Sequence, residues 1–174
     1  MTDTQALIIS LAKSLSDLLV IDYILYLDNL FSNILLAKIL EKLDIDIMSM
    51  IWVNILRFSL ELVQLKQVKQ SLKWEHLKTA EADEIDCFLW QDNNQILDMT
   101  TVYNLTDTII RARKRSSHTS TYASITRSVF ENFLIKELSI PVDINAYNHY
   151  MREVDIENQY WAGFTTLQHQ NQYY

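Results

Sequence analysis

The chain has 174 residues, 49% of them hydrophobic and 21% charged, which is an ordinary composition for one globular domain. Its formal net charge of −7 argues against a protein that binds nucleic acid over a broad basic face. A single cysteine excludes an internal disulfide, and the four scattered histidines lack the spacing of metal ligands. Glycine and proline occur once each, so turns that need a positive φ must be made by Asn, Asp or Ser.

The first element expected along the chain is a helix. Residues 4–19 place leucines and isoleucines on one face at helical spacing, which is typical of a packed helix. The residues before it lack the basic region of a signal peptide, and no apolar run approaches the roughly 20 residues that a membrane span needs. We therefore expect an intracellular protein that does not interact with a membrane.

An apolar, aromatic-rich strand is predicted at 23–27, and it ends at Asp28. A helix follows at about 31–43, with Ser32 or Asn33 available as its cap. Open α/β sheets place their chemistry where strands end, so Asp28 is a candidate functional carboxylate. The alternative is that Asp28 is only the polar stop of the strand or the cap of the helix.

The middle of the chain alternates between apolar and polar runs. The run at 47–56 predicts a second strand beside the first. Residues 60–80 are typical of a surface helix and a connector, because lysines recur among leucines. Two β-rich runs at 85–90 and 96–103 flank the polar residues 91–95, which predicts a hairpin.

A polar stretch at 106–127 is predicted to be a mobile loop, with four basic residues followed by a Ser/Thr-rich tract. These basic side chains could bind DNA phosphates or serve as a nuclear import signal. The alternative is a solvated charged loop with no binding role. A final helical segment is predicted from 147 to about 170. The candidate DNA-binding residues are Arg111, Arg113, Lys114 and Arg115.

Three blocks carry a resemblance to a known family. The block Asp-Asn-Leu-Phe-Ser-Asn at 28–33, with the helix after it, resembles the second-carboxylate block of piggyBac-type transposases. Residues 87–93, Cys-Phe-Leu-Trp-Gln-Asp-Asn, resemble fungal piggyBac-like sequences. The block from Tyr147 to Asp155 is similar to the family's Tyr-Asn-x-x-Met-Gly-Gly-Val-Asp, except that Arg152 and Glu153 replace the two glycines.

The resemblance implies a fold and a metal site. The family has a ribonuclease-H-like core whose three aspartates hold two Mg²⁺ ions, and Asp28 and Asp155 match two of them. We expect a mixed α/β fold and a partial core, because no predicted strand precedes the first helix to carry the remaining aspartate. The expected single domain, 1–174, comprises a core at 1–58, an insertion-like region with the basic loop at 59–136, and a C-terminal helical segment at 137–174.

These expectations lead to two main functional hypotheses, and an active magnesium nuclease is a third. The first is a degenerate remnant of a transposase catalytic domain, inactive as an enzyme, that binds DNA weakly through its basic loop and could also bind a transposase-like subunit. This hypothesis implies a nuclear location, with the cytoplasm as the alternative. The second is an α+β protein-interaction module in which Asp28 and Asp155 are structural and the aromatic tail at 160–174 docks a partner.

Overall fold

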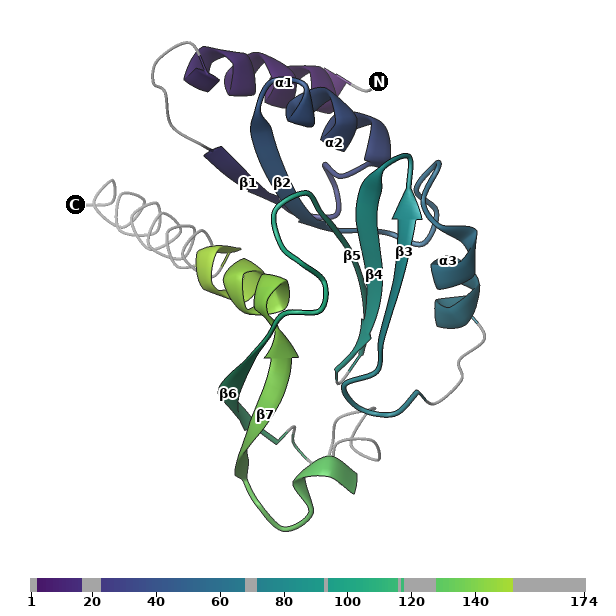
Figure 1. The fold of residues 1–174 in the computed structure, drawn as a ribbon, viewed down its shortest axis with the longest axis vertical. Coiled ribbons are helices and arrows are strands. Elements are labelled where there is room, and N and C mark those ends of the chain that lie inside the picture. Colours follow the sequence, from purple (N-terminus) through teal and green to yellow (C-terminus); the bar gives the residue numbers. More distant parts are fainter. Residues whose placement is uncertain are drawn as a thin grey trace, which may run out of the picture.

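A five-stranded mixed sheet forms the centre of the protein (Figure 1). Its strand order is β1 (Tyr23–Leu27), β2 (Ile45–Met50), β5 (Gln95–Thr100), β4 (Ile85–Gln91) and β3 (Leu77–Ala82). A separate two-stranded ribbon contains β6 (Thr108–Lys114) and β7 (Ile135–Pro141). The mixed α/β fold expected from the sequence is therefore confirmed. No helix of the described residues is long and apolar enough to cross a membrane. The computed structural model describes residues 3–16, 23–67, 72–92, 94–115, 117 and 128–151.

The first half of the chain forms the helix–strand–helix unit that the sequence predicts. The elements are α1 (Asp3–Ser16), β1 (Tyr23–Leu27), α2 (Ile34–Glu41) and β2 (Ile45–Met50). β1 and β2 pair in parallel, which confirms that the second apolar run lies beside the first. Asn33 is the N-cap of α2, because its side chain accepts a hydrogen bond of 2.7 Å from the Leu36 N–H.

The second strand is shorter than the apolar run that predicted it. The prediction of a strand through residue 56 is wrong, because β2 ends at Met50 and the chain then forms turns. The Ile55 N–H donates to the Trp52 carbonyl at 3.3 Å, and Arg57 has a positive φ of 68°. These turns bury Ile51 and Phe58 in the core and leave Trp52 and Leu56 exposed.

An antiparallel meander completes the sheet. It follows α3 (Leu60–Gln67) and consists of β3 (Leu77–Ala82), β4 (Ile85–Gln91) and β5 (Gln95–Thr100). The predicted hairpin around residues 91–95 is confirmed, since β4 and β5 pair antiparallel. The sequence missed β3 within the region expected to be a helix and connector. β5 also pairs with β2, and this joins the meander to the parallel strands.

The two-stranded ribbon corrects the prediction of a loop beginning at residue 106. β6 (Thr108–Lys114) pairs antiparallel with β7 (Ile135–Pro141), so basic residues expected in a mobile loop lie in a regular strand. The ribbon extends away from the five-stranded sheet in Figure 1. A helix begins directly after it and is described over 142–151, five residues earlier than predicted.

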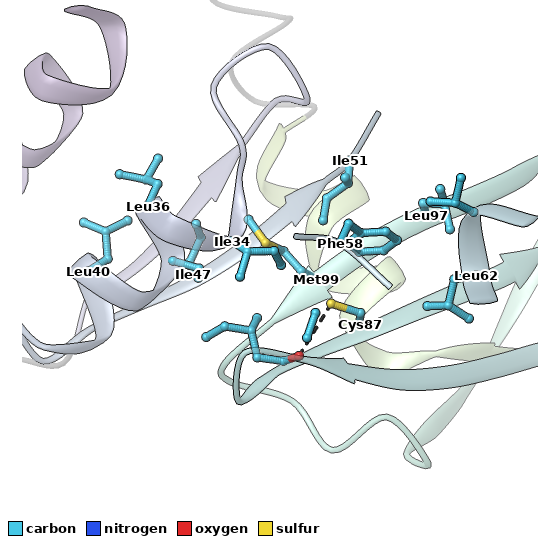
Figure 2. Close-up of a cluster of buried hydrophobic side chains, with 14 of the residues drawn as sticks. Ile34, Leu36, Leu40, Ile47, Ile51, Phe58, Leu62, Cys87, Leu97 and Met99 are labelled. Atoms are coloured by element: carbon cyan, nitrogen blue, oxygen red, sulfur yellow. Dashed lines mark hydrogen bonds between the residues drawn. The ribbon is translucent and has the colours of Figure 1, made fainter. Parts of the chain in front are cut away.

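Two hydrophobic clusters lie on opposite faces of the sheet. Side chains of α1, α2 and α3 pack with inward residues of all five strands in the larger cluster, and Figure 2 shows its centre around Ile34, Ile47 and Met99. On the other face the helix at 142–151 and the ribbon contribute Ile144 and Ile140. The smaller cluster on that face contains Phe88, Trp90, Leu105, Ile140 and Ile144. The sheet is thus covered on both sides, as expected for a layered α/β architecture.

Several turns adopt left-handed backbone conformations without glycine. The expectation that Asn, Asp or Ser would fill these positions is only partly correct, since glutamate and arginine occupy four of them among the described residues. A side chain with a Cβ atom costs about 1 kcal/mol in this region. The positions are Asp44, Arg57, Glu75, Asp83, Glu84 and Glu131.

Candidate functional site

Asp28 occupies the position that the sequence predicts, directly after β1 at the edge of the sheet. Its side chain is exposed, and its Oδ1 accepts a hydrogen bond of 2.6 Å from the Asn29 N–H. Its carbonyl accepts hydrogen bonds from the Phe31 N–H at 3.0 Å and the Ser32 hydroxyl at 2.8 Å. The Ser32 hydroxyl is also bonded to that of Ser49 on β2. The turn is therefore fixed to the sheet while the carboxylate remains accessible.

The helix at 142–151 packs against the strand that ends at Asp28. The Tyr147 hydroxyl donates a hydrogen bond of 3.4 Å to the carbonyl of Leu27, the residue before Asp28. The ring of Tyr150 lies on that of Tyr26, with ring centroids 4.6 Å apart. The structure thus brings the start of the predicted C-terminal block to the end of β1.

A phenol pair stabilises this contact from the loop after β5. The Tyr26 and Tyr103 hydroxyl groups are hydrogen-bonded at 2.9 Å. Burial, followed by this hydrogen bond, raises the pKa of Tyr26 above its usual value, so the phenol stays protonated near neutral pH. Asp155, the predicted partner of Asp28, lies outside the described residues. That the Asp155 carboxylate shares a site with that of Asp28 stays a prediction.

The four predicted DNA-binding residues lie on or directly after β6, and three of them have partners within the chain. The Arg111 Nε donates to the Asn145 side-chain oxygen at 2.8 Å, and an Arg115 guanidinium N–H donates to the Glu131 carbonyl at 3.0 Å. Arg113 forms an ion pair with Asp92. Within the part of the chain that the structure describes, Lys114 is exposed and has no such partner. Their role in DNA binding stays a prediction.

A pair of buried carboxyl groups is the feature that the sequence analysis missed. Asp98 lies on β5 in the middle of the sheet, and Asp143 lies in the first turn of the helix at 142–151. They are 0% and 2% exposed. Oδ1 of each accepts a hydrogen bond from the next backbone N–H, that of Met99 at 2.8 Å and that of Ile144 at 2.7 Å. Oδ2 of each is buried without a hydrogen-bond partner among the described residues.

Burial dominates the acid–base behaviour of this pair. It raises the pKa of Asp98 well above its usual value, and the charge of Asp143 raises it further. Burial also raises the pKa of Asp143, to about 6. The available sequence signal was Asp98 itself, a carboxyl group inside the apolar run Ile-Leu-Asp-Met at 96–99. Nothing in the sequence indicated that the charge of a residue 45 positions later would act on it.

The carboxylates of the described residues do not form a metal site. No group of three or more His, Cys, Asp or Glu side chains in this part of the chain is arranged to hold a metal ion. The nearest contact of the Asp28 carboxylate that the structure records is a backbone N–H rather than a second acidic side chain. These residues alone therefore do not fit the two-metal site implied by the resemblance.

The mixed sheet carries an accessible aspartate at the end of a parallel strand, with a helix packed beside it, and this defines an α/β domain with an acidic group where such sheets place their functional residues. Comparison with family models matches residues 2–173 to the family described as Transposase IS4. The chain belongs to this transposase family, whose ancestral enzymes required a divalent metal ion. Searches of curated proteins and of solved structures found no match.

Proposed function

We propose that the chain descends from the catalytic domain of a piggyBac-like transposase and now contacts DNA weakly without cutting it. Membership of the transposase family supports the descent. The hydrogen bond from Tyr147 to the Leu27 carbonyl is the observation that carries the proposal, because it joins two separate parts of the resemblance. One is the block beginning at Asp28, and the other is the block from Tyr147 to Asp155.

The loss of cleavage follows from the number of acidic ligands. In this proposal Asp28 and Asp155 are the two remaining ligands of an ancestral Mg²⁺ site. Two carboxylates leave a pair of divalent ions poorly coordinated and mutually repelling. Among the described residues, no three His, Cys, Asp or Glu side chains are arranged to hold a metal ion. Strand cleavage should therefore be absent even with abundant metal.

Residual DNA contact would involve the ribbon of β6 and β7. Arg111 and Lys114 are both exposed on β6, and Lys114, which has no partner among the described residues, can approach a phosphate. Arg113 is less available because it is paired with Asp92. Binding through so few cations should be weak, independent of sequence and sensitive to salt. A DNA-bound remnant of this kind would act in the nucleus, alone or with a transposase-like subunit.

Cleavage is tested by incubating the purified chain with supercoiled plasmid DNA and Mg²⁺ or Mn²⁺. We expect no nicking above that of a metal-free control. Metal-dependent nicking that persists in Asp86→Asn, a variant of an exposed carboxylate on β4, but disappears in Asp28→Asn would overturn the proposed inactivity. The same result would strengthen the proposed ancestry, so the two parts of the proposal are tested separately.

Binding is tested by fluorescence anisotropy with a labelled DNA duplex over a series of salt concentrations. We expect the variant that combines Arg111→Gln with Lys114→Gln to bind more weakly. The slope of log affinity against log salt should become shallower by about 0.9 for each DNA phosphate that is no longer neutralised. The matched control is Lys78→Gln on β3, whose ammonium group pairs with Glu61 at 3.0 Å. Equal affinity of both variants would contradict a role for the ribbon.

One observation favours the second candidate function, a protein-interaction module. Three large apolar side chains at the outer end of the ribbon, at the start of β7 and just before it, are 60–67% exposed. Such a group of apolar residues is typical of a protein contact surface. If the wild-type chain fails to bind DNA at low salt, and Leu134→Asp abolishes capture of a partner protein, this function is favoured. The three residues are Phe133, Leu134 and Ile135.

A further inference from the structure

The buried carboxyl groups of Asp98 and Asp143 connect the sheet to the helix at 142–151. β5 lies between β2 and β4, so Asp98 is in the interior of the sheet, while Asp143 belongs to the helix that covers that face. Backbone N–H groups satisfy one oxygen of each carboxyl group, and the other oxygen of each has no partner among the described residues. Two carboxylates held in this way would keep their charges out of water with only one oxygen of each compensated by hydrogen bonds.

No basic side chain of the described residues acts on the pKa of either carboxyl group, and Arg111 on β6, which reaches the same helix, donates its hydrogen bond to Asn145. The Asp143 carboxylate raises the pKa of Asp98, and two backbone N–H groups lower it. Only backbone N–H groups lower the pKa of Asp143. On the same side of the sheet, the flanking strands β2 and β4 carry Asp46 and Asp86, which are acidic as well. The loop after β5 adds the phenol of Tyr103 and the exposed Asp107, and the helix adds the phenol of Tyr147.

The other neighbours of the pair are apolar. Phe88 is directly opposite Asp98 on β4, and Met50 is opposite it on β2. Ile144 follows Asp143 and packs with Phe88 in the smaller hydrophobic cluster. An ionised carboxylate is strongly disfavoured in such surroundings, and a second one close by is disfavoured further. The docked helix is therefore compatible with a neutral or singly charged pair.

We propose that the helix at 142–151 docks on the sheet through a proton-linked contact. It rests against β5 while Asp98 and Asp143 together hold at least one proton, and it loosens when both carboxyl groups have released their protons to solvent. Loosening also removes the contacts of Tyr147 and Tyr150 with β1. The position of this helix beside Asp28 would thus depend on pH.

The direction of the effect follows from the raised pKa values. Both carboxyl groups have a higher pKa in the folded chain than the value near 4 that an unfolded aspartate has. Their contribution to stability is complete below that value and is lost as pH rises through about 6, the folded pKa of Asp143, and beyond it. For each proton released, the folding equilibrium constant should fall by up to about tenfold per pH unit.

The test combines urea unfolding with hydrogen exchange between pH 5 and pH 8.5. For the wild-type chain we expect the unfolding free energy to fall as pH rises, with protection factors falling earlier at 142–151 than at 85–91. The variant combining Asp98→Asn with Asp143→Asn should lose most of this pH dependence, whereas the control Asp86→Asn should keep it. An unchanged pH profile in the double variant, or an equal loss of protection in both segments, would overturn the proposal.

Infrared spectroscopy of the wild-type chain supplies a readout that does not require the double variant to fold. A protonated carboxyl group absorbs separately from a carboxylate, and its signal should be present at pH 6 and decline together with the protection of residues 142–151. Asp143→Asn should remove part of that signal. The absence of any protonated carboxyl signal at pH 6 would show that the pair is ionised in the docked state and would overturn the proposal.

Discussion

The guanidinium group of Arg113 forms an ion pair with the carboxylate of Asp92, and this contact joins β6 to the residue that follows β4. The two side chains are 26% and 9% exposed, so the pair is largely removed from solvent. The ion pair therefore holds the ribbon against the main sheet, together with Ile140, which packs with Trp90 in the smaller hydrophobic cluster. Removal of one partner would leave the other charge poorly solvated.

This ion pair predicts that substitutions of two neighbouring basic residues differ in their effect on the free energy of unfolding. Arg113→Leu should lower the free energy of unfolding by about 2 kcal/mol, less than a fully buried pair because of its remaining exposure. Lys114→Gln should change it by less than about 0.5 kcal/mol, because its side chain is on the surface. Urea denaturation at pH 6 measures both. Similar stabilities of the two variants would mean that the Arg113 contact contributes little.

The cap of α2 provides a second prediction. Asn33→Ala removes the acceptor of the Leu36 N–H and should lower the free energy of unfolding by about 1 kcal/mol. Asn33→Ser retains an oxygen that can accept this hydrogen bond, so it should lower the free energy of unfolding much less. Thermal or urea unfolding of both variants distinguishes the hydrogen bond from a general effect of substitution. Equal losses would argue against the capping interaction.

The scarcity of glycine makes one stabilising substitution predictable. Glu75 is exposed and has a φ of 64°, a conformation that glycine adopts without steric cost. Glu75→Gly should raise the free energy of unfolding by roughly 0.5 kcal/mol, since relief of the left-handed backbone exceeds the added freedom of the unfolded chain. Glu75→Ala keeps the Cβ atom and should give no gain. A loss of stability in Glu75→Gly would contradict this interpretation of the turn.

The single cysteine should be chemically inert in the folded protein. Burial, followed by the charges of Asp86 and Asp98, raises the pKa of the Cys87 thiol to about 12. At pH 8 only about one thiol in ten thousand is then a thiolate, which is the reactive form. Iodoacetamide labelling followed by mass spectrometry should show slow modification of the native chain and rapid modification in urea. Fast labelling without denaturant would indicate that the larger cluster opens readily.

Local pattern was sufficient to predict the unit at the start of the chain. The apolar run at 23–27 and the amphipathic residues after it determine β1 and α2 largely by themselves, and Asn33 provides a recognisable cap. The hairpin of β4 and β5 was also predictable, because a polar loop separates two runs rich in β-forming residues. The position of Asp28 followed directly from these elements.

The missed elements depend on partners that are distant in the chain or weakly suggested by their own residues. β3 has the sequence Leu-Lys-Thr-Ala-Glu-Ala, whose composition does not favour a strand, and it is extended because it pairs along its length with β4. β6 has the composition of a solvated basic loop, and only its pairing with β7 places Ile109 opposite Ile140. The effect of the Asp143 charge on Asp98 depends on that same placement of the helix after β7.

β1 lies at one edge of the sheet and pairs only with β2 among the described residues, and its five residues include no charge and no proline. The opposite edge strand, β3, carries Lys78 and Glu81, the kind of charged side chain that discourages pairing between molecules. The outer side of β1 therefore offers extended backbone groups to any unfolded segment nearby. At high protein concentration, growth of fibrils should begin at this strand.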